Sequence, residues 1–106
     1  MSEVFVVEQD GNVGKITLSG RIDSSNAPAL AQTLQRLVSE NTSRVVCLAH
    51  ELTFISSMGL RAFVVAKQKF GKDGDIFLIG ASPDVVNIFV LTGFDRFILI
   101  QDSYPD

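Results

Sequence analysis

The chain has 106 residues, of which 46% are hydrophobic and 20% charged, and its formal net charge is −3. A chain of this length supports one sizeable hydrophobic core, so we expect a single domain spanning residues 1–106. The acidic balance argues against binding along a nucleic-acid backbone, which needs a basic face, and we expect no nucleic-acid partner.

The sequence carries no recognisable targeting signal. No N-terminal segment joins a basic start to an apolar stretch of signal-peptide length, and no apolar run reaches the roughly 18 residues of a membrane span. The single cysteine, Cys47, cannot form an internal disulfide, which fits a reducing compartment. We therefore expect a cytoplasmic protein without a membrane partner.

The N-terminal part of the chain predicts a β-hairpin and then a helix. Val4–Glu8 is rich in β-forming residues, Asp10–Gly11 is a turn signal, and Lys15–Asp23 alternates apolar and polar residues, as a strand with one buried face does. Ser24–Asn26 holds three good N-cap residues. Apolar residues at helical spacing then predict a helix that ends near Glu40–Asn41.

Strands and helices alternate through the rest of the chain. Arg44–Ala49 and Asp75–Gly80 are short continuous apolar runs, typical of strands buried on both faces. Helices are expected over Gly59–Phe70 and from Ser82 to about Thr92, the second with proline at its first position. Arg96–Ile100 is the last predicted strand.

The predicted order β-β-α-β-α-β-α-β indicates an α/β fold with right-handed crossovers and a mixed, mostly parallel sheet. In open sheets of this kind, functional groups gather at the carboxyl ends of the strands. Two such ends carry polar clusters. They are Asp23 with Ser24 and Ser25 after the second strand, and Ser56 with Ser57 after the third.

Catalytic chemistry finds little support in these residues. The only histidine, His50, falls in the predicted connection His50–Ile55, and no GxSxG elbow presents a serine nucleophile. One histidine and one cysteine provide no cluster with zinc-ligand spacing. Gly11–Thr17 precedes a strand, whereas a phosphate loop opens a helix. We expect no enzyme, metal or cofactor; a serine hydrolase using Ser57 and His50 is the third hypothesis.

The stretch FISSMGLRAF (Phe54–Phe63) raises the question of why two serines are adjacent. One serine at a helix start is explained by capping, but one cap needs only one hydroxyl. Gly59 removes a side chain in the first turn and lets another backbone approach closely. Met58 places a flexible apolar side chain where a docking partner would bury it.

A phosphate on Ser57 would suit the fold but not a partner. A helix N-terminus carries partial positive charge and free N–H groups, which tolerate an anion. Phosphorylation adds about −1.5 to −2 charges, and with Asp23 nearby it would repel a protein docked on this surface. A modification that keeps the fold and disrupts an interface acts as a switch.

Three segments resemble the STAS domain, and more narrowly the bacterial anti-sigma factor antagonists. They are SGRID (Ser19–Asp23) before a capped helix, LTFISSMGLRAF (Leu52–Phe63) and DIFLIGASPDVVNIFVLTGFDRF (Asp75–Phe97). The similarity runs over nearly the whole chain. It implies a mixed sheet with helices packed against it. It also implies that the unphosphorylated protein binds an anti-sigma factor serine kinase and frees a sigma factor for transcription.

The resemblance assigns roles by position. Ser57 becomes the residue that the kinase phosphorylates, and a separate serine phosphatase resets the protein. Ser56 stays open as an alternative acceptor, because the family often has Asp there. Asp23 closes the second strand, where the family contacts its partner, and Gly59 matches the motif glycine. The expected partner-binding residues are Asp23, Ser24, Ser25, Ser56, Met58, Gly59 and Arg61.

Two points of the resemblance leave alternatives. The family usually has a C-terminal helix, whereas this sequence stops at Tyr104–Asp106, so the helix is absent or the sequence is short. A lost helix would leave apolar surface, and we expect a monomer or weak dimer. The second hypothesis for function is a STAS scaffold or sensor module in a stressosome-like or transporter-linked complex.

Overall fold

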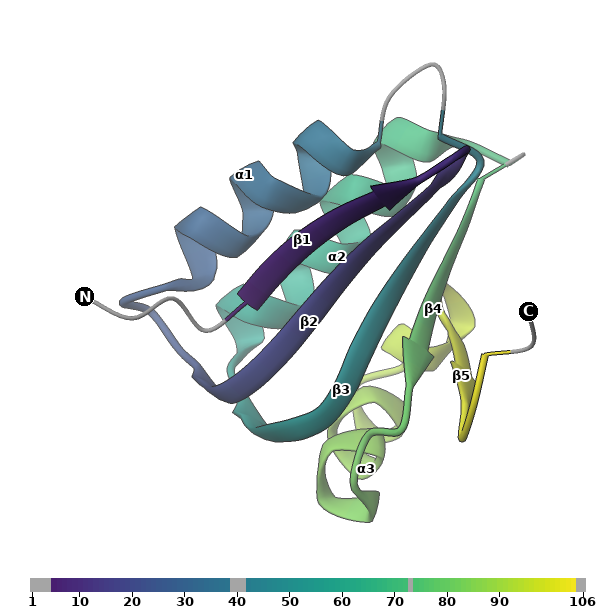
Figure 1. The fold of residues 1–106 in the computed structure, drawn as a ribbon. Helices are drawn as coiled ribbons and strands as arrows, with labels where there is room; N and C mark the ends of the chain where they lie inside the picture. The colour runs from purple at the N-terminus through teal and green to yellow at the C-terminus, as the bar shows by residue number, and fades with distance from the viewer. Residues whose placement is uncertain (1–4, 39–41, 73, 105–106) are drawn as a thin grey trace.

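The computed structural model describes residues 5–38, 42–72 and 74–104 (Figure 1). The predicted order of strands and helices is confirmed, with one short 3-10 helix, η1, added before the last strand. The elements are β1 (Phe5–Asp10), β2 (Val13–Ile22), α1 (Ala27–Leu37), β3 (Arg44–Ile55), α2 (Ser57–Phe70), β4 (Asp75–Ile79), α3 (Pro83–Leu91), η1 (Phe94–Arg96) and β5 (Leu99–Gln101).

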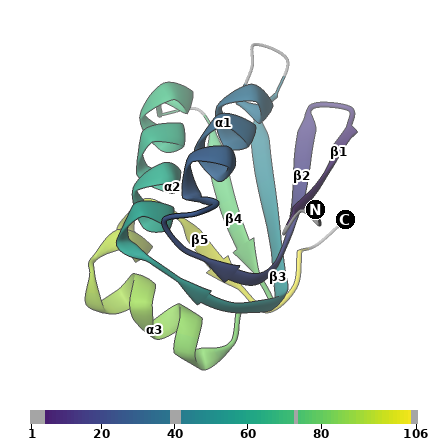
Figure 2. The same ribbon diagram turned by 90° about the vertical axis from the view of Figure 1, so that its left-hand side faces the viewer.

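The five strands form one sheet in the order β1-β2-β3-β4-β5. β1 runs antiparallel to β2, and every other neighbouring pair is parallel. The mixed, mostly parallel sheet expected from the sequence is therefore confirmed. α1 and α2 lie side by side on one face of the sheet, with α3 on the same side (Figure 2).

The main core lies between that face and the helices. Alternate residues of β2, such as Ile16 and Leu18, point into it, and α1 presents Leu30 and Leu34 from one side of its helix. Burial of such apolar faces is the chief stabilising force of a domain of this size. α1 and α2 are fixed over the sheet by this packing, so their N-termini are fixed as well.

The opposite face of the sheet has a smaller apolar cluster around Val46, Phe77 and Ile79. Tyr104 covers part of it, with its ring centroid 5.1 Å from that of Phe77 in an edge-on arrangement. The Arg44 guanidinium donates a hydrogen bond to the Tyr104 hydroxyl at 3.0 Å. The end of the described chain is thus tied across the open face.

The predicted connection His50–Ile55 is wrong, because β3 continues to Ile55. Leu52 and Ile55 stay buried, and register shifts in the pairing with β2 between Thr17 and Ser19 and between Gly20 and Arg21 absorb extra residues. β4 pairs with β3 only as far as Leu48. Beyond that point β2 and β3 run on as a two-stranded ribbon.

Other boundaries differ by a few residues. α2 begins at Ser57 rather than Gly59. α1 ends at Leu37, and its predicted end at Glu40–Asn41 lies outside the described residues. The last strand begins at Leu99, because η1 takes up Phe94–Arg96 after the left-handed Gly93 (φ +78°).

The contact between α2 and α3 rests on two fully buried aromatic rings, Phe63 and Phe89, with centroids 5.8 Å apart. We predict that Phe89→Ala lowers the free energy of unfolding by about 3–5 kcal/mol, the usual cost of such a cavity. Urea titration followed by circular dichroism measures it. Leu91→Ala, at a site 77% exposed, should stay within about 0.5 kcal/mol of the parent; equal losses would contradict this packing.

Candidate functional site

Two strand ends that are 33 residues apart in the sequence meet at one edge of the sheet. Ile22, the last residue of β2, pairs with Ile55, the last residue of β3. The Ser56 N–H donates to the Ile22 carbonyl at 2.8 Å. Asp23 and Ser56 therefore follow directly on paired residues, and the two polar clusters found in the sequence lie at the same edge (Figure 1).

The ribbon that carries this edge is braced by side chains. The Arg21 guanidinium lies 4.4 Å from the centroid of the Phe54 ring, within the range of a cation–π interaction. The Thr53 hydroxyl donates to the Gly20 carbonyl at 3.0 Å. Both contacts join β2 to β3 beyond the last residue of β3 that is paired with β4, so they brace the strand ends where the sheet has narrowed to two strands.

Ser56 is the helix cap. Its backbone is extended (φ −84°, ψ 172°), and its hydroxyl oxygen accepts a hydrogen bond from the Gly59 N–H at 3.3 Å. This is the usual way in which a serine satisfies one of the free N–H groups at a helix start. Ser56 is half-buried, and its hydroxyl already serves the fold.

Ser57 differs from its neighbour in each of these respects. It is the first residue of α2 and is exposed. Its side chain makes no hydrogen bond to any residue in 5–38, 42–72 or 74–104. The first turn of α2 also contains no acidic residue, so the positive end of the helix dipole is not offset there by a carboxylate. Ser57 presents a free hydroxyl at an electropositive helix end.

Gly59 is required by packing beneath the helix. It is buried, and a Cβ at this position would lie 2.7 Å from Cγ1 of Ile55 and 2.8 Å from Cγ2 of Ile22. The sequence predicted that another backbone would approach Gly59 closely, but the nearest atoms belong to the side chains of Ile22 and Ile55. The missing side chain lets the start of α2 sit directly on the two strand ends.

The segment after β2 forms a tight turn around Asp23. The Asp23 carboxylate accepts from the Ser25 hydroxyl at 2.6 Å and from the Ser25 N–H at 3.0 Å. These hydrogen bonds stabilise the ionised form and so hold the pKa of Asp23 below its ordinary value, with the bond from the Ser25 hydroxyl making the largest contribution. The Asp23 N–H in turn donates to the Asn26 side-chain oxygen at 2.9 Å. Asp23 is thus an oriented, ionised carboxylate.

The helix start that follows is only partly as expected. The N-cap of α1 is Asn26, but its side chain makes no capping hydrogen bond to the helix. Its amide instead points back into the turn, donating from Nδ2 to the Arg21 carbonyl at 2.9 Å. The side-chain hydrogen bonds of Asn26 therefore stabilise the turn that carries Asp23. Ser24 and Ser25 are exposed in this turn.

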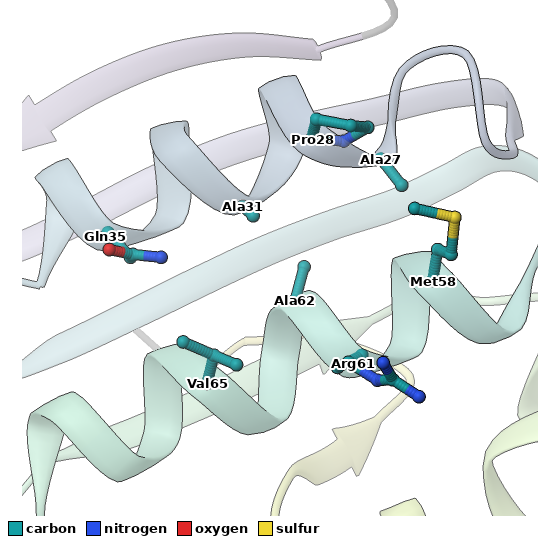
Figure 3. Close-up of a pocket in the computed structure, with 8 residues that line it drawn as sticks. All are labelled: Ala27, Pro28, Ala31, Gln35, Met58, Arg61, Ala62 and Val65. Carbon is teal, nitrogen blue, oxygen red and sulfur yellow. The ribbon is translucent and has the colours of Figure 1, made fainter.

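A groove runs from this edge between α1 and α2 (Figure 3). Met58, which is 49% exposed, and Arg61 lie along it. The full lining is Ala27, Pro28, Ala31, Gln35, Met58, Arg61, Ala62 and Val65, around a volume of about 290 Å³. The sequence did not predict this groove. One of its properties, the absence of acidic residues from both helices that form it, is visible in the sequence.

His50 does not reach the serines. It lies in β3, five residues before the strand ends, which at about 3.3 Å per residue is roughly 16 Å of strand. It lies with Lys15 and Tyr104 around a hollow on the opposite face of the sheet. The serine-hydrolase hypothesis is therefore wrong.

In residues 5–38, 42–72 and 74–104, no three or more His, Cys, Asp or Glu side chains gather where they could hold a metal ion. None of the helices in the same ranges is both long enough and apolar enough to cross a membrane.

Comparison with known proteins identifies the class of this fold. Residues 4–106 match the STAS domain family, so the chain belongs to that family. A relative named as an anti-sigma factor antagonist, BtrV of Bordetella bronchiseptica, is 37% identical over 87 residues, which make up 81% of this chain and 75% of that protein.

Solved structures agree. An anti-sigma factor antagonist from Mycobacterium paratuberculosis superposes with a TM-score of 0.82 at 26% identity, over 93% of this chain and 85% of that one. The anti-sigma factor antagonist SpoIIAA in its unphosphorylated form gives a TM-score of 0.79 at 17% identity, over 91% and 86%. SpoIIAA of Bacillus in its phosphorylated form gives 0.71 at 16% identity, over 91% and 89%.

The two serines make different predictions for stability. Ser56→Ala removes the cap of α2 and should lower the free energy of unfolding by about 1 kcal/mol. Ser57→Ala removes an exposed hydroxyl without a partner among the described residues and should change it by less than about 0.5 kcal/mol. Urea unfolding of both variants measures the difference. A larger loss for Ser57→Ala would reverse the assignment of the cap.

The hydrogen bonds to Asp23 predict a measurable titration. Ser25→Ala should raise the pKa of Asp23 toward its ordinary value, because the hydroxyl is the largest cause of the lowering. Since the folded-state pKa lies below the unfolded one, this carboxylate stabilises the fold above its unfolded pKa, and the stabilisation is lost as the pH falls through the folded pKa.

Carbon-detected NMR titration of the Asp23 carboxyl reads this change directly. Ser24→Ala is the matched control, since no hydrogen bond joins Ser24 to Asp23 in the described chain. An Asp23 pKa that is the same in Ser25→Ala and in the parent would show that the turn is not formed as described.

Proposed function

We propose that this chain, as one STAS domain over residues 1–106, is an anti-sigma factor antagonist that is controlled by phosphorylation of Ser57. The unphosphorylated protein binds an anti-sigma factor serine kinase and so releases a sigma factor for transcription. The phosphorylated protein no longer binds the kinase. The observation that carries the proposal is the separation of roles at the start of α2. Ser56 is used by the fold, and Ser57 is exposed and unused.

The fold can accept a phosphate on Ser57. The residue lies at the N-terminus of a 14-residue helix whose first turn has no acidic side chain. The free N–H groups and the dipole at such an end favour an anion. No internal hydrogen bond of the described chain has to be broken, because the Ser57 hydroxyl makes none.

A docked partner would not accept the same phosphate. The modification adds about −1.5 to −2 charges at an edge where the Asp23 carboxylate is already ionised. Met58, the next residue, offers a half-exposed apolar side chain for burial. A surface that has to lose its water on docking binds poorly once a phosphate stands in it.

The proposed contact surface follows the sequence expectation. It consists of Asp23, Ser24, Ser25, Ser56, Met58, Gly59 and Arg61. Within it Gly59 contributes through its packing on Ile22 and Ile55, which sets the position of the helix start. The relatives named as anti-sigma factor antagonists support the proposed function, and the choice of these contact residues remains part of the proposal.

In this scheme the domain is a substrate and a binding partner rather than an enzyme. The catalytic base and ATP belong to the kinase, and a separate serine phosphatase removes the phosphate. The proposed site of action is the cytoplasm, where sigma factors are used.

The proposal predicts a single phosphorylation site. Incubation with the anti-sigma kinase and ATP should add one phosphate to the parent protein, and peptide mapping by mass spectrometry should place it on Ser57. Ser57→Ala should remove the labelling and keep the affinity for the kinase, because the hydroxyl has no role in the fold.

Ser103→Ala is the control, since it removes an exposed serine beside the hollow on the opposite face of the sheet and should be labelled like the parent. Labelling that persists in Ser57→Ala would move the acceptor to Ser56 or elsewhere. A parent protein that neither binds nor is labelled by any kinase-type anti-sigma factor would refute the proposal.

A further inference from the structure

The groove between α1 and α2 has the form of a site for a helix. Its walls are made mostly of small or apolar side chains, with Ala27 and Ala31 from α1 facing Ala62 and Val65 from α2 (Figure 3). Small residues let another element approach the backbone closely. The α2 residues Met58, Arg61, Ala62 and Val65 follow the spacing i, i+3, i+4 and i+7, which marks one face of a helix.

Two of these residues are unusually open for apolar side chains. Met58 is 49% exposed and Val65 is 38% exposed, one near each end of the lining that α2 provides. The distance from Met58 to Val65 along the helix is about 10 Å at 1.5 Å per residue. A partner segment of two to three helical turns would cover the groove and bury both side chains.

All the charged side chains on α1 and α2 are basic. The sequences APALAQTLQRL and SMGLRAFVVAKQKF contain no aspartate or glutamate, although the whole chain has 12 acidic residues and a net charge of −3. The four cations of α1 and α2 are Arg36, Arg61, Lys67 and Lys69. An acidic protein therefore presents two neighbouring helices, α1 and α2, whose charged side chains are all basic.

Three of these cations are engaged and one is free. Lys69 donates to the Gln35 carbonyl at 2.9 Å, Lys67 donates to the Gly71 carbonyl at 3.1 Å, and Arg36 reaches the Thr33 hydroxyl at 3.5 Å. Arg61 is exposed and makes no hydrogen bond or ion pair to any described residue. It is also the only one of the four that lines the groove.

We infer that the α1–α2 groove binds an amphipathic helix of the anti-sigma factor, with an apolar face against Met58, Ala62 and Val65 and an acidic side chain paired with Arg61. Helix-in-groove recognition uses anchors at this spacing, and charge complementarity selects the acidic flank. The inference rests on the proposed function for the identity of the partner, and it extends the docking surface from the strand ends along α2.

A matched pair of charge reversals tests the groove in the full complex. Isothermal titration calorimetry of the kinase-type anti-sigma factor should show Arg61→Glu binding at least about tenfold more weakly than the parent. Arg96→Glu makes the same change in net charge on η1, which packs against α3 and β5, and should bind within about twofold of the parent. Reversing the facing acidic residue of the anti-sigma factor to Lys should restore binding to Arg61→Glu.

A second measurement judges the groove without the anti-sigma factor. Two stapled helical peptides of about three turns share an apolar face at i, i+3, i+4 and i+7, and carry either Glu or Lys on its flank. In NMR spectra of the isotopically labelled protein, the Glu peptide should shift the amides of Met58, Ala62 and Val65 and the Lys peptide should not. Arg61→Glu should reverse that preference.

The outcomes separate this inference from the proposed function. Strong binding of the anti-sigma factor to the parent, with equal affinity for Arg61→Glu and Arg96→Glu, would overturn the groove and leave the proposed function standing. Absence of binding to the parent would refute the proposed function, and the peptides alone would then decide. Equal shifts by both peptides, shifts centred away from α2, or no shifts would overturn the groove.

Discussion

The pairing of Ile22 with Ile55 at the ends of β2 and β3 is the constraint on which the rest of the site depends. It is closed by the bond from the Ser56 N–H to the Ile22 carbonyl at 2.8 Å, and it is held by the Arg21–Phe54 contact in the part of β2 and β3 that extends beyond β4. Because the two strands end together, the turn around Asp23 and the start of α2 emerge side by side. Gly59 then lets α2 rest on the side chains of the same two isoleucines.

This joint explains how one helix start would serve both the fold and the proposed phosphorylation switch. Capping needs one side-chain oxygen, and Ser56 supplies it while its backbone stays tied to β2. The next hydroxyl, on Ser57, is left free in solvent at the positive end of the helix dipole. Asp23 is held ionised nearby by Ser25. In the proposed switch, the local field would accommodate a phosphate within the chain, whereas a partner that covers Asp23 and Met58 would meet two like charges in a surface it must desolvate.

Much of the fold, and the edge of the sheet that carries the candidate site, could be predicted from the periodicity of apolar residues in the sequence. The alternation in Lys15–Asp23 and the apolar runs of β3 and β4 predicted the mixed sheet. Because the carboxyl ends of parallel strands lie at the same edge of a sheet, the meeting of the two polar clusters could be predicted as well. The miss at His50–Ile55 arose because the bulged pairing with β2 breaks the alternation of β3 after Ala49, so the pattern looked like a connection. Which serine caps α2 depends on backbone angles that residue types alone do not set. The groove required two helices to be placed side by side, which no local pattern contains, although their shared lack of acidic residues could have been noticed.

The proposed switch requires that a phosphate on Ser57 be tolerated by the fold and disruptive to the docked partner. The most direct test uses one sample of the protein phosphorylated on Ser57. Its free energy of unfolding and its affinity for the anti-sigma factor are both measured and compared with those of the unmodified protein. We expect the free energy of unfolding of the phosphorylated protein to lie within about 1 kcal/mol of the unmodified value. Its affinity for the anti-sigma factor should be at least about a hundredfold weaker, which is about 2.7 kcal/mol of binding. A phosphorylated protein that binds as tightly as before, or that loses its fold together with its affinity, would contradict the proposed switch.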